Sequence, residues 1–221
     1  MKKALYLALP IAMMAQGCLT DLVSKKGNGH IKTESRDLAA FHAIELIGEG
    51  KVIIEQGPGS TIMLTGDENL LSLVNTSVKE GTLVIRPKEK QHLRFTKDLV
   101  LVIHTPAVDN ISLVGNGNIS NKGVLSCENL DVSLTGIGNI QLKGNAQKVE
   151  ADLTGTGNMM LDFVSQSLDV DVTGTGDVRL MGKTGTADLH VTGTGDIDAT
   201  GLESGAMSSK TTGLGKIRTG K

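Results

Sequence analysis

The sequence predicts an all-β solenoid, in which short strands coil repeatedly and stack in parallel. Three observations predict this fold. First, a Gly-x-Gly motif recurs, with its first glycine at Gly115, Gly136, Gly155, Gly174, Gly193 and Gly213. Second, the intervals are 21, 19, 19, 19 and 20 residues, so each coil has about 19–21 residues. Third, apolar and polar residues alternate around each motif, which is the pattern of strands with one buried face.

The alternation assigns each side chain of a coil to the inside or the outside. Inward positions lie two and four residues before the first glycine, and four and six residues after it. In the coil around Gly174 they hold Val170, Val172, Val178 and Leu180. Each coil is therefore expected to contain two short strands joined by a Gly-x-Gly corner. The last coil offers a more polar inward set, Met207, Ser209 and Thr211, which suits the capped end of a stack.

The corners themselves call for special backbone geometry. Both glycines stand where the chain must bend sharply, and we expect a positive φ at one of each pair. Asn or Asp follows the second glycine in five corners, at Asn118, Asn139, Asn158, Asp177 and Asp196. Such side chains bond neighbouring backbone groups at turns, so we expect them to be structural rather than ligands.

The region before the repeats is less regular. A seventh motif copy stands at Gly48, 67 residues before Gly115, a distance of roughly three further periods. Between the two copies we expect strands near residues 61–65, 76–78, 82–85 and 99–103, with a hairpin turn at Glu80-Gly81. Residues 67–74 are expected to form a short helical turn capped by Asp67. Residues 86–97 are basic, and we interpret them as a solvated loop or protected edge rather than a site for anionic envelope polymers.

The N-terminus has the features of a lipoprotein signal peptide over residues 1–17. Lys2 and Lys3 precede an apolar run that is too short to span a bilayer. The following Ala15-Gln16-Gly17-Cys18 resembles a bacterial lipobox, in which Cys18 is lipidated and becomes the first mature residue; a secretory signal with a chance cysteine is the alternative. The residue after the cysteine is Leu19, which favours the outer membrane. Polar residues 18–33 are expected to be a tether, and residues 34–221 the solenoid.

The composition excludes several function classes. The 22 basic and 24 acidic residues are balanced, so the chain has no overall attraction for nucleic acid. Aromatic residues, on which carbohydrate and single-stranded nucleic-acid sites depend, are limited to Tyr6, Phe41, Phe95 and Phe163. The five histidines are scattered, and no nucleophile elbow or zinc-binding helix motif occurs. We therefore expect no catalysis and no cofactor apart from weakly bound surface calcium.

One outward-facing group of residues is a candidate site. If the coils stack in register, carboxylates form a two-column acidic face that consists of Asp131, Glu150, Asp152, Asp169, Asp171 and Asp188. Unit charges about 5 Å apart in water repel each other by roughly 0.8 kcal/mol before screening. The face is thus either a solvated surface relieved by salt and Lys210, or a site for divalent cations or a basic partner. Any calcium affinity is expected to be weak, on the order of millimolar.

The TGTGDV-type repeats, behind a strand-rich first half and a lipoprotein signal, resemble the family described as the putative auto-transporter adhesin "head GIN" domain. The resemblance also includes Arg36-Asp37-Leu38 and the GEGKV copy at Gly48, and it spans about residues 34–220. It implies a single-stranded right-handed parallel β-helix with no established activity.

Three function classes follow from these observations. The first is a lipid-anchored binding or adhesion module of the cell envelope, with envelope polymers or surface proteins as partners. The second is a structural envelope protein that self-associates. The third is a polysaccharide-acting enzyme, because some β-helices have that activity. The sequence favours the first.

Overall fold

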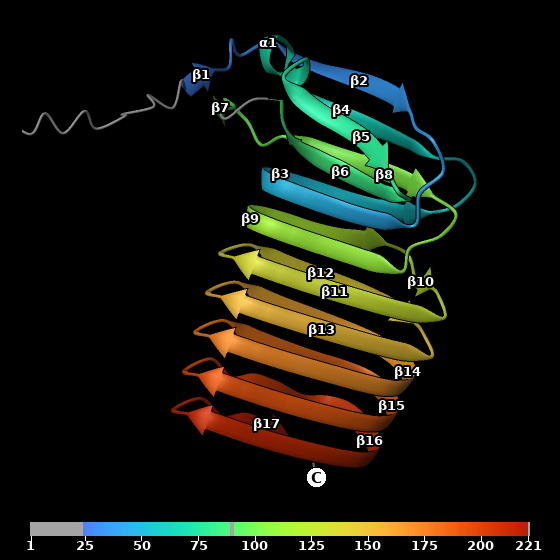
Figure 1. The fold of residues 1–221 in the computed structure, drawn as a ribbon, viewed down its shortest axis with the longest axis vertical. Helices are drawn as coiled ribbons and strands as arrows, with labels where there is room; N and C mark the ends of the chain where they lie inside the picture. Colours follow the sequence, from blue (N-terminus) through green and yellow to red (C-terminus); the bar gives the residue numbers. More distant parts are fainter. Residues whose placement is uncertain (1–23, 89–90, 221) are drawn as a thin grey trace, which may run out of the picture.

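The computed structural model describes residues 24–88 and 91–220. In this part the chain forms an all-β solenoid of about six turns with coils of about 20 residues, which confirms the predicted fold class. Figure 1 shows the coils stacked one below another, with an irregular cap over the N-terminal end of the stack and the C-terminus at its other end.

The repeats form the regular part of the stack. Its strands are β9 (Asn110–Lys122), β10 (Leu125–Ser126), β11 (Asn129–Gly136), β12 (Asn139–Asn145), β13 (Lys148–Gly155), β14 (Asn158–Gly174), β15 (Asp177–Gly193), β16 (Ile197–Gly213) and β17 (Ile217–Thr219). Neighbouring coils pair in parallel, and each first glycine of a corner is the register partner of the next. In β14, β15 and β16 the two predicted short strands merge, because backbone pairing continues across the bend opposite the corner.

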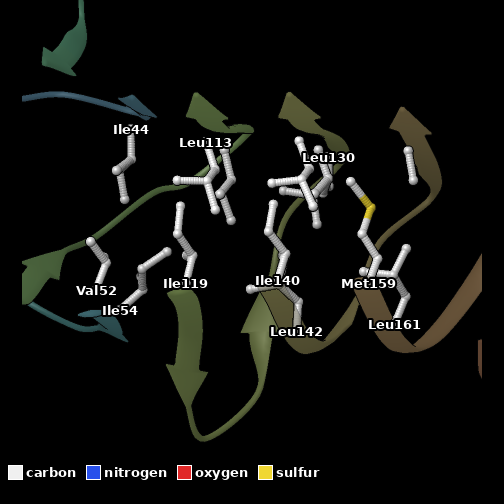
Figure 2. Packing of buried hydrophobic residues seen from close by; sticks show 14 of the residues in the cluster. Ile44, Val52, Ile54, Leu113, Ile119, Leu130, Ile140, Leu142, Met159 and Leu161 are labelled. Carbon is white, nitrogen blue, oxygen red and sulfur yellow. The ribbon is translucent and has the colours of Figure 1, made fainter. Parts of the chain in front are cut away.

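The aliphatic ladders predicted from the alternation form the core. Val170, Val172, Val178 and Leu180 are at most 1% exposed. Figure 2 shows Ile119, Ile140 and Met159 of three successive coils in one row. A third inward position, six residues before the first glycine, was predicted only in the last coil, at Met207. It is buried in four coils, at Leu130, Val149, Leu168 and Ala187.

The corners need both of their glycines, for two different reasons. The first glycine has the expected positive φ, for example 134° at Gly136 and 124° at Gly174, a conformation that glycine adopts without penalty. The second glycine has no room for a side chain. A Cβ atom at Gly176 would lie 2.2 Å from the carbonyl oxygen of Gly157 in the previous coil. The two glycines therefore allow the chain to bend and the corners to stack closely.

The seventh motif copy, at Gly48, lies closer to the repeats than its sequence spacing predicts. Strand β3 (Ala43–Gln56) pairs directly with β9, and Gly48 is the register partner of Gly115. The two copies are therefore adjacent coils and not three periods apart. Residues 57–88 and 91–109 between them build the cap, and the chain then returns to the next coil.

The cap continues both sides of the solenoid above β3. Its elements are β2 (Ile31–Asp37), β4 (Thr61–Asp67), α1 (Glu68–Leu71), β5 (Val74–Lys79), β6 (Thr82–Pro87) and β8 (Val100–Thr105). On one side β8 pairs parallel with β3, and β4 and β2 follow in antiparallel order. On the other side β6 pairs with β3, and the predicted hairpin at Glu80-Gly81 joins β6 to β5. Antiparallel strands thus cover the N-terminal edge of the parallel stack.

Asp67 precedes α1 as predicted, but its side chain does not cap the helix. The buried carboxylate instead accepts hydrogen bonds from the backbone N–H of Gly29 at 2.6 Å and from Thr96, through its N–H at 2.7 Å and its hydroxyl at 2.8 Å. These bonds hold a two-stranded sheet of β1 (Ser24–Lys26) and β7 (His92–Arg94) against the cap. The Asp67 side chain therefore binds residues that are distant in the sequence instead of capping α1.

The expected tether also needs correction. Residues 24–33 include β1 and the start of β2, so they belong to the folded cap. They are ordered by Asp67 and by pairing with β4 and β7, which are distant in the sequence. Residues 18–23 of the tether and the signal peptide of residues 1–17 lie outside the described residues.

Candidate functional site

The structure brings all six residues of the acidic face together on one side of the stack. Asp131, Glu150, Asp169 and Asp188 are successive register partners on β11, β13, β14 and β15. In the second column Asp152 pairs with Asp171, and the next coil continues with His190. The predicted two-column arrangement is therefore present, although nothing in the structure tests what it binds.

Mutual repulsion is visible in the electrostatics of this face. Partial burial raises the pKa of Asp152, and the negative charges of Asp171 and Asp131 raise it further. Partial burial also raises the pKa of Asp169, with Asp171 and Asp188 adding to the effect. Two contacts relieve the crowding. Lys148 forms an ion pair with Glu150, and the His190 ring lies 3.5 Å from the carboxylate of Asp188.

The acidic face does not form a closed metal centre. Within residues 24–88 and 91–220, no group of three or more His, Cys, Asp or Glu side chains is placed to hold one metal ion. Calcium usually takes six to eight oxygen ligands, so water would have to complete the shell of an ion on this face. Weak surface calcium stays a prediction.

The corner residues Asn118, Asn139, Asn158, Asp177 and Asp196 form a ladder, as the structural interpretation predicted. The amide of Asn139 donates to Asn118 at 2.9 Å, and that of Asn158 donates to Asn139 at 3.1 Å. Asp177 accepts from the backbone N–H of Asp196, and Asp196 from that of Lys216. Their hydrogen bonds join neighbouring coils.

Of the two cysteines, the structure describes Cys127. Cys18, the predicted lipid attachment site, lies outside the described residues. Cys127 is a half-buried free thiol. Its burial, together with the charge of Asp109, raises its pKa, so it remains protonated and poorly reactive at neutral pH.

No helix in the described part of the chain is long and apolar enough to span a membrane.

The sequence did not predict a groove beside the first corners of the stack. We call it the corner groove; its apolar lining includes Leu46, Val74, Ile85, Leu93, Phe95 and Ile137, and its volume is about 350 Å³. It continues into a wider polar hollow of about 650 Å³, which we call the basic mouth, with Lys51, Arg94 and Lys97 at its rim. The sequence signal for this groove is the alternation of basic and apolar residues over 92–95, which lies within the basic segment 86–97 and is equally typical of a solvated loop.

Comparison with known proteins places the chain among adhesin-like domains. The model of the family described as "Putative auto-transporter adhesin, head GIN domain" matches residues 40–163 and 153–220. No curated protein matches the chain significantly.

Solved structures share the fold over most of the chain. A "putative adhesin" from Parabacteroides distasonis has a TM-score of 0.84 at 25% identity and covers 89% of this chain and 84% of its own. A "putative adhesin" from Parabacteroides merdae has a TM-score of 0.80 at 21% identity, covering 90% and 100%. A "putative lipid binding protein" from Parabacteroides distasonis has a TM-score of 0.79 at 20% identity, also covering 90% and 100%. The last two show the common fold alone, and none of the three names is that of an enzyme.

Proposed function

The chain belongs to the family described as "Putative auto-transporter adhesin, head GIN domain", and on this premise we propose that it is a non-catalytic binding module of the cell envelope. It meets a basic partner, directly or through calcium, with the acidic face of β11, β13, β14 and β15. The family description and the adhesin name of the solved neighbour at 25% identity support this class of function.

The observation that carries the proposal is that the fold does not require carboxylates at these positions. The same register positions hold Asn110 and Ser112 in the coil above the face, and Ser208 and Lys210 in the coil below it. Coils with neutral or basic residues at these positions therefore pair in the same register. Carboxylates persist in the middle coils although they repel each other, which supports a role in binding.

The test is retention of envelope proteins on the immobilised protein at low and at physiological salt. We expect Asp169→Asn with Asp171→Asn to reduce retention about tenfold, because each column loses one of its carboxylates. A matched control, Glu128→Gln with Glu203→Gln, removes two exposed carboxylates outside the face and should leave retention unchanged. Equal losses of retention in both variants would mean that retention depends only on the net charge of the protein, which would contradict the proposal.

Calcium adds a second readout for the same face. A ligand that binds only the folded state raises the melting temperature. Millimolar calcium should therefore raise the melting temperature of the wild type more than that of Asp169→Asn with Asp171→Asn. Equal shifts, or no shift in either protein, would leave a direct basic partner as the function of the face.

Attachment to the outer membrane through Cys18 is the other part of the proposal. Its support is the lipobox-like Ala15-Gln16-Gly17-Cys18 and the apolar run before it. Stable anchoring needs more than one acyl chain, which lipoprotein modification supplies. Cys18→Ser should move the protein from the membrane fraction to the soluble envelope fraction. Continued sedimentation of this variant with the outer membrane would contradict lipid anchoring.

Self-association remains a second candidate function, because the last coil is paired on one side only within the described residues. Its inward positions Ser209 and Thr211 are exposed and polar, which disfavours burial beneath another copy. Light scattering of the purified protein distinguishes this candidate, since a self-associating solenoid would form oligomers.

A further inference from the structure

The corner groove lies where two distant parts of the chain meet. One wall is formed by the first three corners of the stack, including Gly48, Gly115 and Ile137. The opposite wall is the segment around β7, with Leu93 and Phe95 facing the groove. Figure 1 shows β7 beside the cap at the edge of the stack on which the corners follow one another. The groove is thus built by the junction of cap and solenoid.

The wall around β7 is held firmly in place. Asp67 binds Thr96, the backbone N–H of Gly27 donates to the carbonyl of Arg94 at 2.8 Å, and β1 pairs with β7. The ring of Phe95 also packs against Gly66, where an added Cβ atom would lie 3.0 Å from the ring. The groove is therefore largely preformed, as binding sites for small ligands usually are.

The size and lining of the groove fit one alkyl chain. Its deep part is formed by core side chains, with Leu46 and Ile85 each 1% exposed, and its outer end by Ile137, which is 64% exposed. A methylene group takes up about as much space as a water molecule, roughly 30 Å³. A volume of about 350 Å³ therefore accommodates on the order of ten methylene groups, but not a second chain.

The basic mouth next to the groove determines the charge of the ligand. Lys51, Arg94 and Lys97 line it together with two carboxylates, Glu49 and Asp98. Within the described residues, the three basic side chains form no ion pairs, and all three are exposed. The two hollows share six residues along their boundary, Glu49, His92, Leu93, Phe95, Leu99 and Asn116. An apolar slot thus opens directly into a region with an excess of positive charge.

We propose that the corner groove binds a medium-chain fatty acid of about twelve carbons, with the alkyl chain in the apolar slot and the carboxylate among Lys51, Arg94 and Lys97. This site is separate from the acidic face, which lies on β11, β13, β14 and β15, and it does not depend on the proposed function. The charge of the mouth favours a carboxylate over a cationic head group, and the volume of the slot favours one chain over two.

The experiment is calorimetric titration of the purified protein with dodecanoate below its micellar concentration. Dodecyltrimethylammonium, with the same chain length and the opposite charge, is the matched ligand. We expect dodecanoate to bind with one-to-one stoichiometry and at least tenfold more tightly than the cation. Equal affinity for the two amphiphiles would show nonspecific apolar adsorption and overturn the proposal, as would no binding of dodecanoate.

Two variants at equivalent corner positions locate the site. Ile137 and Leu214 are the middle residues of their corners and are both exposed, at 64% and 82%, but only Ile137 lines the groove. Ile137→Asp should weaken dodecanoate binding at least tenfold, whereas Leu214→Asp should leave it unchanged. Equal effects of the two substitutions would overturn the proposal.

A second pair of changes tests the mouth and the identity of the occupant. Arg94→Glu with Lys97→Glu should weaken dodecanoate binding and strengthen binding of the cationic amphiphile, which a merely structural role of these exposed residues would not produce. A change of oligomeric state in Ile137→Asp, without an effect on fatty-acid binding, would assign the groove to a second copy of the chain and overturn the proposal.

Discussion

At Asp169 a carboxylate stands between Glu150 and Asp188 of neighbouring coils. Its pKa is raised, first by partial burial and then by the charges of Asp171 and Asp188. A raised pKa means that the folded state takes up the proton more readily than the unfolded state, so the ionised group destabilises the fold at neutral pH. The destabilisation disappears as pH falls through the folded-state pKa towards the ordinary value of 3.8.

We therefore predict that Asp169→Asn stabilises the protein at pH 7 by no more than about 0.5 kcal/mol, because solvent screens these charges. The gain in melting temperature should shrink between pH 7 and pH 4 and vanish below pH 4. Thermal unfolding across this range measures it. A variant less stable than the wild type at pH 7 would contradict the repulsion argument. The expected gain also fits a surface kept for binding at some expense of stability.

Asp67 has the opposite dependence on pH. Burial opposes its charge, but hydrogen bonds from Thr96 and Gly29 outweigh burial and lower its pKa. Its contribution to stability is thus present above the ordinary pKa of 3.8 and is lost as pH falls through the lower folded-state value. Asp67→Asn should lower the melting temperature at pH 7, and the deficit should narrow below pH 4. If the deficit in melting temperature does not change with pH, the substitution acts through altered packing or hydrogen-bond geometry and not through the charge of Asp67.

At the scale of the element, each corner is a bend in one coil and a contact with the next. The second glycine carries the contact, since a Cβ atom at Gly176 would lie 2.2 Å from the carbonyl oxygen of Gly157 and 2.4 Å from the Leu153 side chain. Overpacking of this kind costs about 1–3 kcal/mol. Gly176→Ala should therefore lower the free energy of unfolding by about this amount in denaturant titrations.

Thr175 provides the matched control for this corner. It is the exposed middle residue between the two glycines, and exposed substitutions usually change stability by less than about 0.5 kcal/mol. Thr175→Ala should thus be close to neutral. Similar losses in Thr175→Ala and Gly176→Ala would mean that the corner is sensitive for a reason other than close stacking.

These elements also show what the sequence could predict and what it could not. The sequence predicts the corners, core positions such as Val170 and Val172, and the acidic face, because these features recur at a short, nearly constant interval. Parallel pairing in register then places each copy beside the copy in the next coil. The adjacency of Gly48 and Gly115 could not be found by counting, because the intervening residues leave the stack. The corner groove joins β7 to the corners of β3 and β9 and thus depends on pairings of distant segments. The sequence around Asp67 predicts a local helix cap, whereas the hydrogen-bond partners of its side chain lie 38 and 29 residues away.

At the scale of the whole molecule, stability depends on where a coil lies in the stack. Each coil contacts only its neighbours, so the stability of a solenoid is approximately a sum of coil and interface terms. A central coil takes part in two interfaces, and a terminal coil in one. Leu134 on β11 is fully buried in the middle of the stack, whereas Met207 on β16 is half-buried in the last coil.

The two positions therefore predict different outcomes for the same substitution. Leu134→Asp buries an unpaired charge, which costs several kcal/mol out of a total that is typically about 5–15 kcal/mol. It also breaks both interfaces of its coil, so we expect loss of the whole solenoid. Met207→Asp can be accommodated by fraying of the last coil, since its carboxylate reaches water there. Hydrogen exchange should show fast amides only near β16 and β17 in Met207→Asp, and throughout the chain in Leu134→Asp. If Met207→Asp also unfolds the entire chain, the coils act as one cooperative unit and the nearest-neighbour description of this solenoid is wrong.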